Sequence, residues 1–255
     1  TRSGSVTGVQ TCALPIYTGG QVKYALELLE NLSTHPEVRR VDLFTRRIID
    51  KRVSSSYEKE IENVNDKANI IRITCGGNSY RVKEVLWDHL DEFVDKTIRF
   101  IEKQDDFPDV VHGHYADGNY IASQISEIYG IPFMATGHSL GRNKKNILRK
   151  EGLSPEKINE KFNIERRIEA EESFLKTADV VIVSTQHEID AHYGLYKNKN
   201  TANFRVLPPG VNTELFYPFY RFDMPSFKMT IEQEQALYRV NSDIERPVLD
   251  RKSVV

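Results

Sequence analysis

Asp109-Val110-Val111-His112 is typical of a short buried strand, and the chain runs from it directly into Gly113-His114-Tyr115-Ala116-Asp117-Gly118. After this polar stretch, isoleucines recur at helical spacing at Ile121, Ile125 and Ile128, up to Gly130. An apolar strand, a polar loop and an amphipathic helix in this order form half of a β–α–β unit. The segment therefore predicts a parallel sheet with crossover helices.

The same alternation extends along the chain in both directions. Further strands are expected at 41–45, 70–74, 131–136, 179–183 and 204–207. Helices are expected at 22–29, 82–102 and 164–178, and the apolar face of the last is interrupted by the carboxylate of Glu171. The charged stretch 54–65 favours a solvated helix or loop. The predicted fold class is α/β, with a doubly wound, mainly parallel, Rossmann-like sheet covered on both faces.

The composition fits a globular protein and excludes some partners. The 255 residues include 35 Lys and Arg against 37 Asp and Glu, and 39% are hydrophobic. Near-neutral charge gives no reason to expect nucleic acid or an anionic membrane as the main partner. No apolar run approaches the roughly 18 residues of a membrane span, so a cytoplasmic protein is expected. Cys12 and Cys75 form neither a metal-binding spacing nor a disulfide framework.

The two ends differ in pattern from the middle. Residues 1–16 (TRSGSVTGVQTCALPI) show neither strand nor helix periodicity and resemble translated sequencing-adapter DNA; a native disordered N-terminus is the alternative. The tail 250–255 looks similar and interrupts a strand that begins at Pro247-Val248-Leu249. We expect no first strand from 1–16 and therefore an exposed sheet edge. A Rossmann-like domain is expected over 17–215 and an aromatic-rich connector over 216–249, with a helix near 231–238.

Polar residues gather where the predicted strands end, which is where open α/β sheets bind ligands. Thr18-Gly19-Gly20-Gln21 precedes a helix, so the glycines and free N–H groups favour an anion or a sugar oxygen. A plain tight turn is the alternative. His138-Ser139, just before Gly141, lies in a loop and is interpreted as functional.

The residues at the end of the predicted strand 109–112 do not favour a metal site. His112 and His114 alternate along an extended segment, and no further ligand cluster accompanies them. A buried, hydrogen-bonded structural role is expected for His112. A ligand role and a structural role remain equally open for His114, Tyr115 and Asp117.

Basic residues give the sharpest chemical indication. Arg142, Lys144 and Lys145 follow the His138 loop, and Arg166-Arg167 open a helix. Guanidinium and ammonium groups together hold a phosphate well, although a solvated basic face is the alternative. No nucleophile elbow, Cys/His pairing or P-loop supports hydrolysis or phosphoryl transfer.

These segments together resemble the sucrose-phosphate synthase family. The resemblance spans about Thr18 to Leu249 and is most specific in TGHSLGRNK (136–144) and RRIEAEE (166–172). It also includes TGGQVKYALELLENL, VDLFTRR, ITCGG, VKEVLWDHLDEFVD, HGHYADGNY, ADVVIVST, LPPGVN and YRVNSDIERPV, all in one order. The resemblance implies the N-terminal half of a retaining glycosyltransferase of the GT-B architecture, whose C-terminal half holds UDP-glucose.

The resemblance also implies roles for individual residues. Fructose 6-phosphate would bind in this half, and glucose would pass to its 2-hydroxyl from UDP-glucose without a metal or other cofactor. His138 would contact the transferred glucose, and the backbone of Gly20 would face the donor phosphates. The implied acceptor contacts are Gly19, Gln21, Tyr115 and Ser139, with a phosphate clamp of Lys144, Arg166 and Arg167.

The sequence departs from the family pattern at three places. Tyr17 stands where the family has Asp, and Ser79 where a phosphate-binding lysine is frequent, with Arg81 as a possible substitute. The second domain, with its acidic pair and nucleotide pocket, is expected after Leu249 and is missing, so this chain is expected to be inactive alone. A mannosylfructose-phosphate synthase using GDP-mannose and a non-catalytic sugar-phosphate sensor are the alternatives.

Overall fold

The computed structural model describes residues 4–9 and 20–211. The chain divides into two compact units, Thr1–Pro208 and Pro209–Val255. Only 209–211 of the second unit are described, so the expected boundary at 215/216, the connector and its helix lie outside the described residues. The architecture below is that of the first unit.

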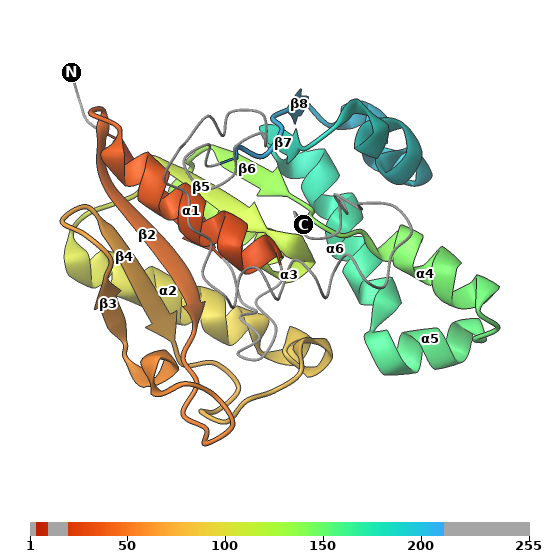
Figure 1. The fold of residues 1–255 in the computed structure, drawn as a ribbon, viewed down its shortest axis with the longest axis horizontal. Helices are drawn as coiled ribbons and strands as arrows, with labels where there is room; N and C mark the ends of the chain where they lie inside the picture. The colour runs from red at the N-terminus through yellow and green to blue at the C-terminus, as the bar shows by residue number, and fades with distance from the viewer. Residues whose placement is uncertain (1–3, 10–19, 212–255) are drawn as a thin grey trace, which may run out of the picture. The chain divides into compact units, whose positions relative to one another are not determined.

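One mainly parallel sheet forms the body (Figure 1). Its eight strands follow the order β3-β4-β2-β1-β5-β6-β7-β8, and only β3 is antiparallel to its neighbour. Their bounds are β1 Gly4–Val9, β2 Val38–Arg46, β3 Ile61–Asn63, β4 Ala68–Ile73, β5 Val110–His114, β6 Phe133–Thr136, β7 Val180–Val183 and β8 Phe204–Val206. The predicted α/β class is confirmed, as are the predicted strands between 41 and 207, with ends that move by a few residues. The strand predicted to begin at Pro247 lies outside the described residues.

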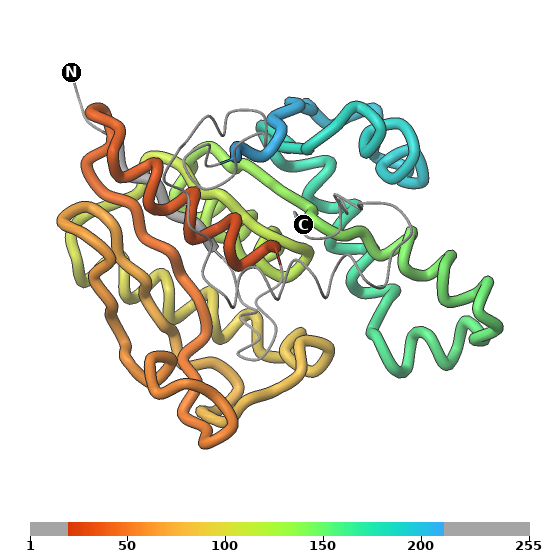
Figure 2. The backbone as a smooth tube through the Cα atoms, in the orientation of Figure 1, coloured from red at the N-terminus to blue at the C-terminus, as the bar shows by residue number. Residues whose placement is uncertain are grey.

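Helices cover both faces of the sheet, with α1 in front of it and α2 behind it in Figure 1. They are α1 Gly20–Thr34, α2 Leu90–Gln104, α3 Tyr115–Tyr129, α4 Gly141–Lys150, α5 Pro155–Phe162 and α6 Ile164–Thr177. The pair α4–α5 projects from the body, as the tube in Figure 2 shows. The sequence did not predict this pair, because its turns carry few apolar residues and Ile158 is its one fully buried aliphatic side chain.

Two apolar clusters correspond to the two faces. The larger joins α2, α3 and α6 to the sheet through Phe93, Phe133 and Phe174, each about 1% exposed. The smaller lies under α1, where Ala25 and Leu29 pack with residues of β2 and β4. Helices bury an apolar stripe on each face of the sheet. The strands between them are therefore covered on both sides, which favours continuous apolar runs.

The expectation that 1–16 contributes no strand is wrong. Residues Gly4–Val9 form β1, which pairs in parallel with β2 on one side and β5 on the other. Ladder hydrogen bonds come from the backbone, so a short extended segment with β-compatible residues such as Val6 and Thr7 can occupy this place whatever its periodicity. The sheet edge expected from a lost first strand is therefore covered.

The predicted helix 82–102 begins only at Leu90. Two short 3₁₀ helices, Lys83–Val85 and Trp87–His89, precede it. Val85 remains 45% exposed whereas Trp87 is 7% exposed, so no continuous apolar stripe exists before Leu90. The stretch 54–65, expected as a solvated helix or loop, holds a short 3₁₀ helix, Ser55–Glu58, and the edge strand β3.

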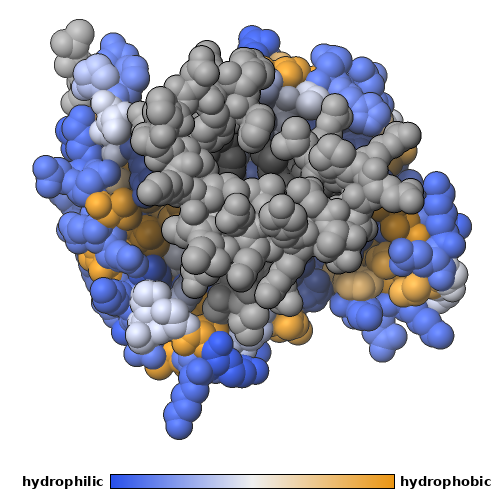
Figure 3. All heavy atoms as spheres, in the orientation of Figure 1, coloured by the Kyte–Doolittle hydropathy of each residue, from blue (hydrophilic) through white to orange (hydrophobic). Residues whose placement is uncertain are grey.

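The described residues that are visible on one face of the molecule are mostly hydrophilic. Blue, hydrophilic residues dominate the coloured atoms visible in Figure 3, and apolar residues appear among them in small groups. Among the described residues, no helix has the length and apolar character needed to cross a membrane.

Replacement of Gly113 by alanine is expected to destabilise the fold by about 1–3 kcal/mol, because a Cβ there would lie 2.7 Å from the Asn119 Cα and 2.9 Å from the Gly118 carbonyl oxygen. Backbone atoms at these distances cannot move aside without shifting α3 against β5. Urea denaturation followed by circular dichroism measures the change. Gly194→Ala is the control, since its Cβ would meet only the Ile189 carbonyl oxygen at 3.9 Å. Equal stability of the two variants would contradict this packing.

Candidate functional site

The polar segments after β5 and β6 lie side by side. The two strands are parallel neighbours in which His114 pairs with Thr136, so both loops leave the same edge of the sheet. This is the edge at which ligands bind in open α/β folds. It brings the His114–Asp117 and His138–Ser139 segments together although they are distant in sequence.

Three histidine rings pack against one another at this edge. His112 Nε2 lies 2.8 Å from Thr136 Oγ1, and His114 Nδ1 lies 3.0 Å from His138 Nε2. Tyr24 of α1 contacts the rings of His114 and His138 edge-on. The expected structural role of His112 agrees with its burial and its hydrogen bond.

Burial keeps these histidines neutral at pH 7. It lowers the pKa of His112 to about 3 and that of His138 to about 4, and it also lowers the pKa of His114. Between two neutral rings, one nitrogen donates and the other accepts. His138 therefore presents a neutral, hydrogen-bonding ring rather than a cation.

Two site residues adopt the left-handed backbone conformation that favours glycine. Tyr115 has φ 68° and His138 has φ 55°. Such a conformation is rare for a bulky side chain and is retained where the surrounding structure enforces it.

A small cleft lies beside these loops, and we name it the Tyr115 cleft. Its lining residues are Lys83, Glu84, Trp87, Tyr115, Asp117, Lys144, Phe162 and Arg167. The structure thus brings together three residues predicted from sequence, Tyr115, Lys144 and Arg167. It adds Lys83, which the sequence interpretation missed.

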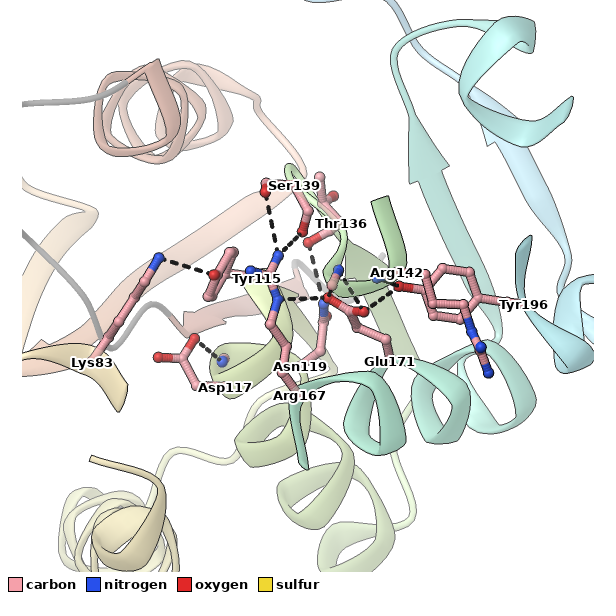
Figure 4. A network of polar contacts seen from close by, with 12 residues as sticks. Lys83, Tyr115, Asp117, Asn119, Thr136, Ser139, Arg142, Arg167, Glu171 and Tyr196 are labelled. Carbon is pink, nitrogen blue, oxygen red and sulfur yellow. Dashed lines mark hydrogen bonds and ion pairs between the residues drawn. The ribbon is translucent and has the colours of Figure 1, made fainter. Parts of the chain in front are cut away.

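Three cations converge on the Tyr115 cleft. Lys83 Nζ donates to Tyr115 Oη at 2.9 Å, and the Arg167 guanidinium lies 4.4 Å from the centre of the same ring (Figure 4). Lys144 Nζ lies 3.8 Å from the centre of the Phe162 ring. Burial and then the nearby charges of Lys83 and Arg167 lower the pKa of Lys144. A bound anion would relieve this repulsion.

Arg167 connects the cleft to the His138 loop. Its Nη2 donates to the Ser139 carbonyl oxygen at 2.5 Å and lies 3.3 Å from Ser139 Oγ. The exposed side chain of Ser139 thus lies within reach of the same guanidinium. Tyr115, Ser139, Lys144 and Arg167 form one polar neighbourhood.

The other predicted residues lie apart from the cleft. Arg166 is exposed, pairs with Asp88 at 2.6 Å and stacks over Trp87 on the outside of the lining. Gly20 is the exposed first residue of α1, and Gln21 follows it half-buried. Gly19 lies outside the described residues.

Lys83, which was not predicted from the sequence, lies close in the chain to Ser79, the position at which the family frequently has a phosphate-binding lysine. Ser79 and Arg81 do not line the cleft, whereas Lys83 does. Lys83 was not predicted as a site residue because the stretch 82–102 was interpreted as one continuous helix. Among the described residues, no group of three or more His, Cys, Asp or Glu side chains is placed to hold a metal ion.

Comparison with known proteins gives consistent matches. The family model for the first GT-B domain of sucrose synthase matches residues 13–201. Probable sucrose-phosphate synthase 1 of Oryza sativa subsp. indica is 41% identical over 216 residues, and sucrose-phosphate synthase of Zea mays is 42% identical over 216 residues. Each alignment covers 74% of this chain but 20% of the relative, so the chain spans about a fifth of the length of these relatives.

A solved structure shares the fold. The sucrose-phosphate synthase of Thermosynechococcus elongatus superposes with a TM-score of 0.66 at 23% identity, covering 87% of this chain and 53% of the other. The architecture expected for the N-terminal half of a GT-B protein is therefore confirmed.

Proposed function

We propose, on the premise that this chain belongs to the family of sucrose synthase first GT-B domains, that the Tyr115 cleft binds the phosphate of fructose 6-phosphate. The observation that carries the proposal is the convergence of Lys83, Lys144 and Arg167 on one cleft. A phosphate dianion accepts charge-assisted hydrogen bonds from both ammonium and guanidinium groups.

The sugar ring would then extend from the cleft toward the His138 loop. Ser139 lies next to Arg167, and α1 reaches the same loop through Tyr24. This arrangement supports acceptor contacts from Tyr115, Ser139 and Gln21, with Gly19 as a further proposed contact. Arg166 joins the clamp only if its ion pair with Asp88 opens.

The longer protein to which this family assigns the chain would transfer glucose from UDP-glucose to the 2-hydroxyl of fructose 6-phosphate. The product would be sucrose 6-phosphate, with retention at the anomeric carbon. We assign the donor to a second domain outside this chain, so the chain alone is the acceptor half. The neutral ring of His138 would hold a hydroxyl of the transferred glucose, and the Gly20 backbone at the start of α1 would face the donor phosphates.

The proposal needs no metal or other cofactor. Donor phosphates can be stabilised by backbone N–H groups and basic side chains that are already in place. In this chain the group proposed to face the donor phosphates is the N-terminus of α1, while the cations of the Tyr115 cleft would hold the acceptor phosphate.

Direct titration tests the acceptor assignment. The 255-residue chain is expected to bind fructose 6-phosphate more tightly than inorganic phosphate, and to bind fructose least, when each is titrated by calorimetry at low salt. Equal affinity for fructose and fructose 6-phosphate would contradict a phosphate site.

Incubation of the longer gene product with fructose 6-phosphate and either UDP-glucose or GDP-mannose tests the reaction. Nuclear magnetic resonance of the product reports both the sugar transferred and its anomeric configuration. An α-glucosyl product from UDP-glucose supports the proposal. Transfer only from GDP-mannose, or a β-linked product, would contradict it.

A further inference from the structure

Glu171 is a carboxylate in the interior of α6, and the function proposed above does not use it directly. It is 1% exposed and occupies the face that also carries Ile164, Ile168 and Leu175. A charged group in such a place requires partners for its negative charge and its lone pairs.

Glu171 has partners from three different parts of the fold (Figure 4). Its Oε1 accepts from Arg167 Nε at 2.9 Å, and both of its oxygens lie 2.9 Å from the Gly141 amide nitrogen. The Tyr196 hydroxyl donates to Oε2 from the opposite side. The carboxylate is thus held by a helix start, a guanidinium and a phenol.

Two of these partners connect Glu171 to the Tyr115 cleft: Arg167 lines it, and Gly141 begins the helix that carries Lys144. Arg167 uses Nε for Glu171 and keeps Nη2 for Ser139, which aims the guanidinium over the Tyr115 ring. Gly141 is the first residue of α4, and Lys144 follows it one turn later. One carboxylate therefore fixes the starting points of two of the three cations.

The close fit around Glu171 leaves little freedom for rearrangement. A Cβ on Gly141 would lie 2.9 Å from Glu171 Oε2. Burial raises the pKa of Glu171, while the Arg167 cation and three hydrogen-bond donors act in the other direction. The ion pair with Arg167, whose side chain is 4% exposed, favours the carboxylate form.

We propose that Glu171 is a positioning residue that aims Arg167 and Lys144 at the phosphate of the bound substrate. The inference rests on the proposed function, because it concerns the same cleft. It goes further by assigning the orientation of the clamp to a residue that cannot touch the ligand itself. The alternative is that Glu171 only supports the fold.

The Glu171→Gln variant of the 255-residue chain separates these alternatives. The amide keeps the size of the side chain but turns one acceptor into a donor and leaves Arg167 without its counter-charge. We expect the affinity for fructose 6-phosphate to fall on the order of tenfold while the affinity for fructose is unchanged. A merely structural role would lower both affinities together or neither.

Glu172→Gln is the matched control. Glu172 lies on the same helix as Glu171 and pairs with Arg142 of α4 at 2.8 Å, but neither Glu172 nor Arg142 lines the Tyr115 cleft. This variant is expected to keep the affinity of the original chain for fructose 6-phosphate. A similar loss in both variants would overturn the positioning role.

The Tyr196→Phe variant guards against a Glu171→Gln variant that does not fold. It removes one donor to Glu171 and keeps the aromatic ring in the core. We expect a loss of a few-fold in fructose 6-phosphate affinity with an unchanged circular dichroism spectrum. Unchanged affinity in this folded variant would overturn the inference.

Inorganic phosphate as a second probe distinguishes the two proposals. If the unmutated chain binds phosphate but not fructose 6-phosphate, the proposed function fails, and the effect of Glu171→Gln on phosphate affinity still decides the positioning role. If the unmutated chain binds neither probe, both proposals are overturned.

Discussion

Fructose 6-phosphate is expected to bind the Lys83→Met/Lys144→Met double variant roughly hundredfold more weakly than the unmutated chain. Both ammonium groups line the Tyr115 cleft. A hydrogen bond to a charged group contributes about 1.5–3 kcal/mol, and each 1.4 kcal/mol corresponds to about a tenfold change in affinity. Calorimetric titration at pH 7 and low salt measures the loss.

Lys145→Met is the matched control for this prediction. Lys145 is adjacent to Lys144 in sequence, but its Nζ pairs with Glu165 at 2.5 Å and it does not line the cleft. Its removal is expected to change the affinity less than threefold, as for a charge in solvent. An equal loss in Lys145→Met and Lys144→Met would indicate general electrostatic attraction instead of a defined site.

Acid is expected to destabilise the chain well before most carboxylates titrate. Burial lowers the pKa of His112 to about 3 and that of His138 to about 4. Below about pH 6.5 the unfolded chain binds protons at these two positions, whereas the folded chain does not. The contribution of the two histidines to the free energy of unfolding is therefore complete above pH 6.5 and is lost as the pH falls. Between pH 6.5 and 5, each histidine lowers the free energy of unfolding by about 2 kcal/mol.

Urea denaturation at pH 6.5 and pH 5 measures this loss. His112→Gln is expected to lower the stability at pH 6.5 but to weaken its pH dependence by about 2 kcal/mol over this interval. The raised pKa of Glu171 acts in the opposite sense. A His112→Gln variant with unchanged pH dependence would contradict a buried neutral histidine.

The inner strands of the sheet could be predicted from the sequence because they are short and largely buried. Runs such as Val180-Val181-Ile182-Val183 have no polar interruption, and the structure places β7 there. The neighbourhood of Tyr115, Lys144 and Arg167 was also predictable. Parallel strands end at one edge, so residues after β5 and β6 had to meet.

Other parts depended on contacts that one-dimensional patterns do not contain. Lys83 follows Val82 in a segment whose apolar residues have helical spacing. In the structure this segment forms short 3₁₀ helices with Trp87 packed into the core, and α2 begins only at Leu90. Glu171 was visible as a break in an apolar stripe, but its partners Gly141 and Tyr196 are 30 and 25 residues away. Strand β1 was missed because residues 1–16 show no strand periodicity, although their backbone pairs with β2 and β5.

A crystal structure of the 255-residue chain with fructose 6-phosphate would locate the bound phosphate. We expect the phosphate in the Tyr115 cleft, within hydrogen-bond distance of Lys144 Nζ and the Arg167 guanidinium, with the sugar ring toward Ser139. A phosphate bound elsewhere, for example at the start of α1 beside Gly20, with the cleft cations left uncontacted, would contradict it.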